Sequence, residues 1–107
     1  MAEGAVSLEK IREAATRIAA QNGGRLAILF GSHARGTATR RSDIDLIFVD
    51  DLDIPYLRRL DRYFDPLADA LDAPIEVLVY TPKEFERMKD RSFVKRALEE
   101  GVVLYER

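Results

Sequence analysis

The segment IDLIFV, residues 44–49, is apolar at every position except Asp45. A strand with one face in water alternates apolar and polar residues, so a run like this is typical of a strand covered on both faces. Three other strand-length apolar runs accompany it: RLAILF at 25–30, PIEVLVY at 74–80 and VVLY at 102–105. Segments with helical spacing lie between them, and 107 residues are one domain's worth of chain. The sequence therefore predicts a single α/β domain, residues 1–107, with one small sheet.

The first helix is predicted to follow Ser7, a good N-cap residue, and to end at Asn22-Gly23-Gly24. Its apolar face is predicted to comprise Leu8, Ile11, Ala15, Ile18 and Ala19.

A second helix is expected after Asp53 and Pro55. Its predicted apolar stripe comprises Leu57, Leu60, Phe64, Leu67 and Leu71. Pro66 is expected to kink this helix, or to restart it with Asp65 as a cap.

Two shorter helices are predicted near the end of the chain. One begins at Thr81-Pro82 and runs through Lys89, and the other is capped by Ser92 and ends at Gly101.

Composition excludes several classes of function. The net charge of −2 argues against strong nucleic-acid binding, which needs a basic face. The absence of cysteine excludes disulfides and thiolate metal sites. The N-terminal segment lacks the apolar core of a signal peptide, and no apolar stretch is long enough to span a membrane. A cytoplasmic protein is expected.

The loop between the strands at 25–30 and 44–49 begins with Gly31-Ser32. Glycine allows a bound group to approach the backbone closely, and successive amides with the Ser32 hydroxyl can hold an anion such as phosphate. The alternative is a plain strand-to-helix turn with Ser32 as the N-cap. The same loop holds His33, which is expected to face solvent.

Asp43 and Asp45 stand two residues apart at the start of the strand at 44–49, so both point to the same face. Two such carboxylates repel each other unless a cation lies between them, and Mg²⁺ prefers oxygen ligands. A pair of these ions is the usual device for displacement at phosphorus. The alternative is that Ser42-Asp43 caps a turn and Asp45 pairs with Arg40 or Arg41.

Glu76 is the second residue of the apolar run that starts at Ile75. If its strand neighbours that of Asp45, its carboxylate can join the pair, either to complete metal coordination or to accept a proton from an attacking hydroxyl. The alternative is an exposed glutamate on an edge strand.

Together these segments resemble the signature of the minimal nucleotidyltransferases of the DNA polymerase β superfamily. That signature is Gly-Ser, ten residues, then Asp-x-Asp, matched here by Gly31-Ser32, residues 33–42 and Asp43-Ile44-Asp45. Ala34-Arg35-Gly36 and SDIDL at 42–46 also match, and IEVLVYTPKEFERM lies where the family has its third acidic strand.

The resemblance implies a polymerase β-like fold, with a small mixed sheet flanked by helices, and transfer of a nucleotide from ATP or another NTP. It implies that Gly31, Ser32, Arg35 and Ser42 bind the nucleotide; Arg35 could instead brace the loop by pairing with an acidic side chain. It also implies that Asp43, Asp45 and Glu76 form the catalytic site and hold two Mg²⁺ ions. Many relatives carry Asp where this chain has Glu76.

Relatives of this size are commonly paired with a helical HEPN-type partner as the antitoxin half of a toxin–antitoxin couple. The resemblance implies AMP transfer from ATP onto such a partner. A second copy of the chain could also complete the site as a homo-oligomer. Two alternatives stay open: an antitoxin that acts by contact alone, and a nucleotidyltransferase that modifies a small molecule such as an aminoglycoside.

Overall fold

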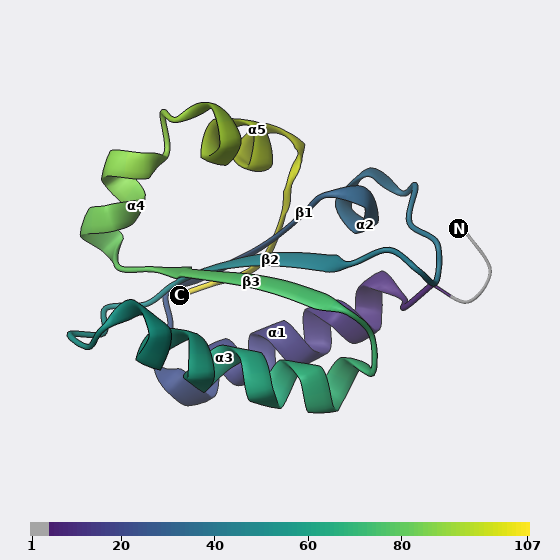
Figure 1. Cartoon of the computed structure of the whole chain (residues 1–107), viewed down its shortest axis with the longest axis horizontal. Coiled ribbons are helices and arrows are strands. Elements are labelled where there is room, and N and C mark those ends of the chain that lie inside the picture. Colours follow the sequence, from purple (N-terminus) through teal and green to yellow (C-terminus); the bar gives the residue numbers. More distant parts are fainter. Residues whose placement is uncertain (1–4) are drawn as a thin grey trace.

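The computed structural model describes residues 5–107 and folds them into helices around one sheet (Figure 1). In chain order the elements are α1 (Leu8–Asn22), β1 (Leu26–Phe30), α2 (Ser32–Arg35), β2 (Ile44–Val49), α3 (Tyr56–Leu71), β3 (Ile75–Tyr80), α4 (Pro82–Met88), α5 (Ser92–Glu100) and β4 (Val102–Glu106). This order confirms the predicted α/β fold class. In the described part of the chain, no helix combines the length and apolarity needed to cross a membrane.

The sheet is mixed, with the strand order β3-β2-β1-β4. β1 pairs antiparallel with both β2 and β4, whereas β2 and β3 run parallel. Every residue of β2 except the half-buried Asp45 is buried, so both faces of this strand are covered, which explains its nearly continuous apolar run. β3 is an edge strand, which leaves its outer side open.

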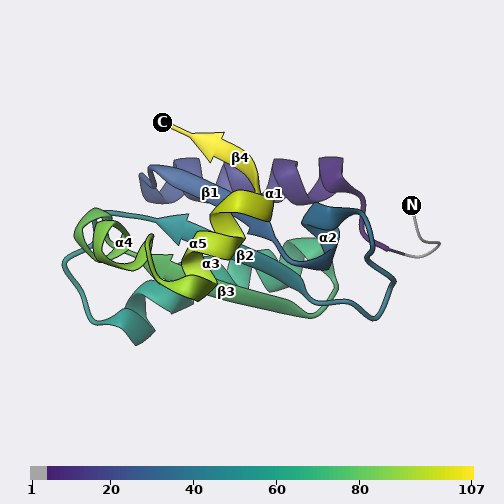
Figure 2. The same ribbon diagram turned by 90° about the horizontal axis from the view of Figure 1, so that it is seen from above.

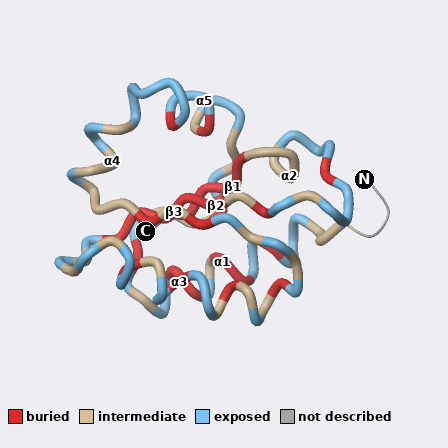
Figure 3. Tube along the Cα trace, viewed as in Figure 1, coloured by how far each residue is buried: buried red, intermediate tan, exposed pale blue. Residues whose placement is uncertain are grey.

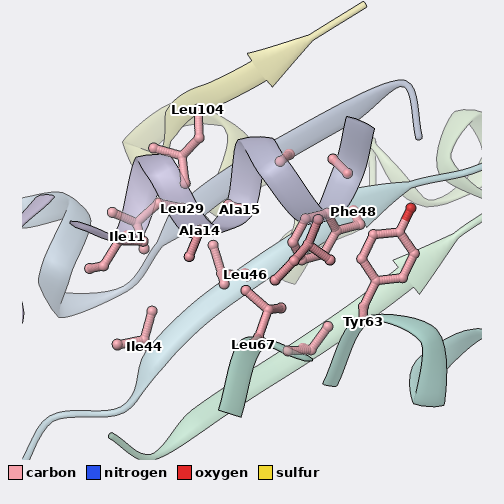
Figure 4. Close-up of a cluster of buried hydrophobic side chains, with 14 of the residues drawn as sticks. Ile11, Ala14, Ala15, Leu29, Ile44, Leu46, Phe48, Tyr63, Leu67 and Leu104 are labelled. Carbon is pink, nitrogen blue, oxygen red and sulfur yellow. The ribbon is translucent and has the colours of Figure 1, made fainter. Parts of the chain in front are cut away.

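The two faces of the sheet are covered unequally. Helices α1 and α3 cover one face, and the shorter α4 and α5 lie over the other (Figures 1 and 2). Side chains from β2 alternate between them: Leu46 and Phe48 enter the core under α1 and α3 (Figure 4), and Ile47 packs against the α5 side. Buried residues gather on the strands and on the helix sides that face them (Figure 3). Asp45 follows the same alternation as Ile47, so it belongs to the less covered face.

The first helix has the predicted ends. Ser7 accepts a hydrogen bond from the Lys10 amide at 3.1 Å, and Gly23 takes the left-handed conformation with φ +75°. Leu8 was expected on the buried face, but its exposed fraction is 42% because it lies in the first turn, beyond the packed part of the helix.

The predicted restart of α3 with Asp65 as a cap is wrong, since the helix continues through Pro66. Proline removes the backbone donor that would bind the carbonyl four residues earlier, which belongs to Arg62. Here the Asn22 side-chain amide, at the end of α1, donates to that carbonyl at 3.0 Å. A tertiary hydrogen bond therefore replaces the missing helical one.

The predicted apolar stripe of α3 is also partly wrong. Leu57 is 73% exposed and Phe64 is 38% exposed. The buried face comprises instead Arg59, Tyr63, Leu67 and Leu71. Arg59 can be buried because Glu84 pairs with it at 2.6 Å and the Ile54 and Val79 carbonyls accept its other donors.

The remaining helices begin close to the predicted positions. Thr81 caps α4 through a reciprocal capping box with Glu84. The N-cap of α5 is Arg91 rather than Ser92, which is the first helical residue.

Candidate active site

Three carboxylates meet at one end of the sheet, on the face that carries α4 and α5. The parallel register pairs Asp45 of β2 with Glu76 of β3, so their side chains point the same way. Asp43 precedes β2 by one residue and joins them. One oxygen from each of the three lies within 4.8 Å of the other two. The structure thus brings together the three acids that the sequence predicted.

None of the ion pairs within residues 5–107 involves an acid of this cluster. Burial, and then the carboxylates of Glu76 and Asp43, raise the pKa of Asp45 to about 6, while Arg35 opposes the rise. Among residues 5–107, the ion pairs include neither Arg40 nor Arg41, so the predicted alternative of an Asp45–arginine pair is wrong. Three oxygen donors with mutual repulsion form a donor set that fits Mg²⁺.

The loop that enters α2 lies directly against this cluster. Gly31 has φ +75° and ψ −156°, a conformation open only to glycine, and a Cβ there would overlap the Asp45 carboxylate. Gly31 is also the N-cap residue of α2. The alternative of Ser32 as the N-cap is wrong, because Ser32 is the first helical residue.

His33 and Ser42 fix the loop internally. The His33 Nδ1 donates to the Asp43 backbone carbonyl at 3.0 Å, so His33 ties α2 to an acid of the cluster rather than simply facing solvent. The Ser42 hydroxyl accepts a hydrogen bond from the Thr39 amide at 2.9 Å. These two hydrogen bonds hold the loop in place next to Asp43, the first acid of the cluster.

Arg35 forms an ion pair with Glu100 of α5 at 3.3 Å, which is the bracing contact expected as one of its two roles. A pocket of about 260 Å³ opens beside it. Its lining comprises Phe30, Gly31, Arg35, Asp45, Phe93, Arg96, Ala97 and Glu100.

Residues of α5 that no motif marks thus border the site. They follow Asp45 by about 50 positions, and only the fold brings them to it. Their one signal in the sequence is the four-residue spacing of Arg96 and Glu100, which is typical of an ordinary helical ion pair.

The chain is similar to proteins of known family. The sequence model of the nucleotidyltransferase domain family matches residues 8–104. A curated relative from Methanocaldococcus jannaschii, "Putative protein adenylyltransferase MJ0604", is 40% identical over 78 residues, which are 73% of this chain and 75% of that protein.

Solved structures share the fold. A toxin–antitoxin crystal structure with AMP-PNP has a TM-score of 0.66 and 23% identity, covering 94% of this chain and 75% of that one. A complex of tri-AMPylated Shewanella oneidensis HEPN toxin with MNT antitoxin has a TM-score of 0.61 and 18% identity, covering 92% of this chain and 72% of that one. With the family model spanning nearly all of its residues, this chain belongs to the nucleotidyltransferase domain family.

Proposed function

We propose that this chain transfers AMP from ATP to a hydroxyl group of a partner protein, and that the partner is a helical HEPN-type protein. The observation that carries the proposal is the convergence of Asp43, Asp45 and Glu76 beside Gly31. The M. jannaschii relative's name supports adenylyl transfer to protein, and the structural neighbours named as HEPN and MNT proteins support the partner class.

The residues divide the work as follows. Gly31 and Ser32 hold the terminal phosphates of the nucleotide through backbone amides and a hydroxyl. Asp43 and Asp45, with Glu76, hold two Mg²⁺ ions, which when bound would neutralise phosphate charge and polarise the phosphoryl oxygens.

In the transfer itself, the acceptor oxygen forms a bond to the α-phosphorus as the bond from that phosphorus to the bridging oxygen breaks. Pyrophosphate leaves with the electron pair of that bond. Glu76 lies exposed on the edge strand, where an acceptor from outside can reach it, and takes the proton of the attacking hydroxyl. Positioning and charge neutralisation supply most of the rate, as in phosphoryl transfer generally.

A labelling experiment tests this function. The chain is incubated with Mg²⁺, a co-purified HEPN-type protein, and ATP labelled on either the α- or the γ-phosphate. We expect protein labelling from the α-phosphate only, because nucleotidyl transfer leaves the γ-phosphate in pyrophosphate. Asp43→Ala and Asp45→Ala should each reduce the label at least ~100-fold. Asp53→Ala removes an exposed acid from the loop after the other end of β2 and serves as the matched control.

Other outcomes identify the alternatives. A partner that is neutralised without any label, equally by wild type and Asp43→Ala, would show an antitoxin that acts by contact. Aspartate-dependent label in the small-molecule fraction would show a different acceptor class.

A further inference from the structure

The pocket beside the acid cluster is bounded on one side by α5, which lies over β1 (Figure 2). It borders Gly31 and Asp45 on the β1 side, whereas Glu76 approaches Asp45 from β3 on the other side. Two arginines line it, Arg35 from α2 and Arg96 from α5. The pocket therefore continues the candidate site away from the acceptor side.

A single carboxylate connects the two arginines. Glu100 Oε2 lies 3.3 Å from Arg35 Nη1, and Glu100 Oε1 lies 3.9 Å from Arg96 Nε. All three side chains are well exposed, with exposed fractions of 49% for Arg35, 81% for Arg96 and 39% for Glu100. Ion pairs this exposed contribute little to stability, so another anion can displace the carboxylate easily.

We propose that Arg96 joins Arg35 in a subsite for the terminal phosphates of the nucleotide, and that Glu100 occupies this subsite until the nucleotide binds. The inference rests on the proposed function and extends it to residues outside the family motif. Glu100 acts here as an internal competitor: its two oxygens bridge the guanidinium groups that phosphate oxygens bridge in the bound state.

The placement of the pocket favours phosphate over the nucleoside as its occupant. The reacting phosphorus must lie at the acid cluster, and the terminal phosphates must lie at Gly31 and Ser32, which border the pocket or adjoin its lining. A guanidinium carries several donors in a planar fork that matches phosphate oxygens, so two of them suit a polyphosphate better than a neutral ring.

The charge of Arg35 also reaches the acid cluster. Arg35 and Asp45 both line the pocket, so this guanidinium lies at the reacting end of the site. Release of Glu100 would leave both arginines free to complete the phosphate contacts.

The test measures binding of ATP with Mg²⁺, and of inorganic pyrophosphate with Mg²⁺, by calorimetry on the full chain. Arg96→Ala should weaken both affinities about fivefold or more, and Arg96→Lys less, because a point charge remains but the fork is lost. Glu100→Gln should strengthen both affinities several-fold, because the competing charge is removed while the side chain keeps its size.

Two neighbours on α5 provide matched controls. Lys95→Ala removes a positive charge and Glu99→Gln a negative one from exposed positions outside the pocket lining, and neither should change either affinity by more than about twofold. Circular dichroism of each variant verifies that the chain keeps the helix content of the wild type.

Three results would overturn the proposal. If Arg96→Ala binds ATP and pyrophosphate as tightly as Lys95→Ala does, and the wild type binds ATP, the subsite is refuted and the proposed function stands. Weakened ATP binding with unchanged pyrophosphate binding would place the nucleoside in this pocket instead. Wild-type protein that binds neither ATP nor pyrophosphate would refute both this subsite and the proposed function.

Discussion

The Asp45 carboxylate lies where its negative charge destabilises the folded protein. It lies on the central strand β2, partly buried, with two other carboxylates beside it and its pKa raised to about 6. Gly31 lies so close that no Cβ fits between them. A chain under selection for stability alone would place an apolar or amide side chain here. These features favour the interpretation that the Asp45 carboxylate is retained because it binds a cation.

Replacing Asp45 by Asn should stabilise the protein in the absence of divalent cations. The folded protein holds the Asp45 proton more tightly than the unfolded chain, whose pKa is near 3.8, so wild-type stability falls as the pH rises from about 4 through 6. At pH 7.5 we expect Asp45→Asn to raise the free energy of unfolding by about 1 kcal/mol, a value reduced from the full shift because the carboxylate is partly exposed.

Urea unfolding in EDTA at pH 7.5 and pH 4 measures this effect. The gain should be present at pH 7.5 and absent at pH 4, where the wild-type carboxyl is protonated. Asp53→Asn, an exposed acid outside the cluster, should change little at either pH. A variant less stable than wild type at pH 7.5 would contradict the expected repulsion.

At the scale of elements, α1 and α3 support each other through Asn22. Its amide nitrogen donates to the Arg62 carbonyl that Pro66 leaves without a helical donor, and its Oδ1 accepts from Arg62 Nη2 at 3.3 Å. Proline can therefore stay inside α3 without breaking it. Helix α3 leads into β3, the strand that carries Glu76. It is held by a hydrogen bond from Asn22, which lies 40 residues before Arg62 in the chain.

The Asn22 contact can be tested by a double-mutant cycle with Pro66. Asn22→Ala should lower the free energy of unfolding by about 1 kcal/mol, because the Arg62 carbonyl loses its donor. In a Pro66→Ala background residue 66 regains a backbone donor for that carbonyl, so the same substitution should cost less than half as much. Chemical denaturation of the four proteins measures both costs. Equal costs in the two backgrounds would show that Asn22 does not substitute for the missing helical bond.

On the scale of the whole molecule, the sheet has one well-covered face and one poorly covered face. Helices of 15 and 16 residues, α1 and α3, cover the first, and helices of 7 and 9 residues, α4 and α5, cover the second. The acid cluster lies at the end of the second face, and Glu76 is on an edge strand. A site this open suits an acceptor that brings its own surface, as a partner protein does.

Under the proposed function Mg²⁺ binds the assembled acids but not the unfolded chain, so it should stabilise the whole fold. At a concentration ten times the dissociation constant, the gain is about 1.4 kcal/mol, or roughly 5 to 10 °C in Tm for a domain of this size. Thermal unfolding with MgCl₂, against NaCl of equal ionic strength, measures it, and Asp43→Ala combined with Asp45→Ala should remove it. An unchanged Tm at every MgCl₂ concentration would show that the acids hold no cation.

Local patterns were enough to predict the order of the elements and the acids of the cluster. Strand and helix periods, the Ser7 and Thr81 caps, and the motif from Gly31 to Asp45 all act over a few residues, so each can be interpreted from neighbouring positions alone. The position of Glu76 beside Asp45 needed one further assumption, that their strands are neighbours, and the parallel register confirms it.

Tertiary structure decided the features that depend on distant partners. Pro66 breaks an isolated helix, but Asn22 supplies the missing donor; Arg59 is a surface residue by type, but Glu84 makes its burial possible. Arg96 and Glu100 reach the site only because α5 folds over β1. Periodicity reports how a residue relates to its own helix or strand, whereas burial of a charge and the lining of a pocket depend on side chains tens of residues away.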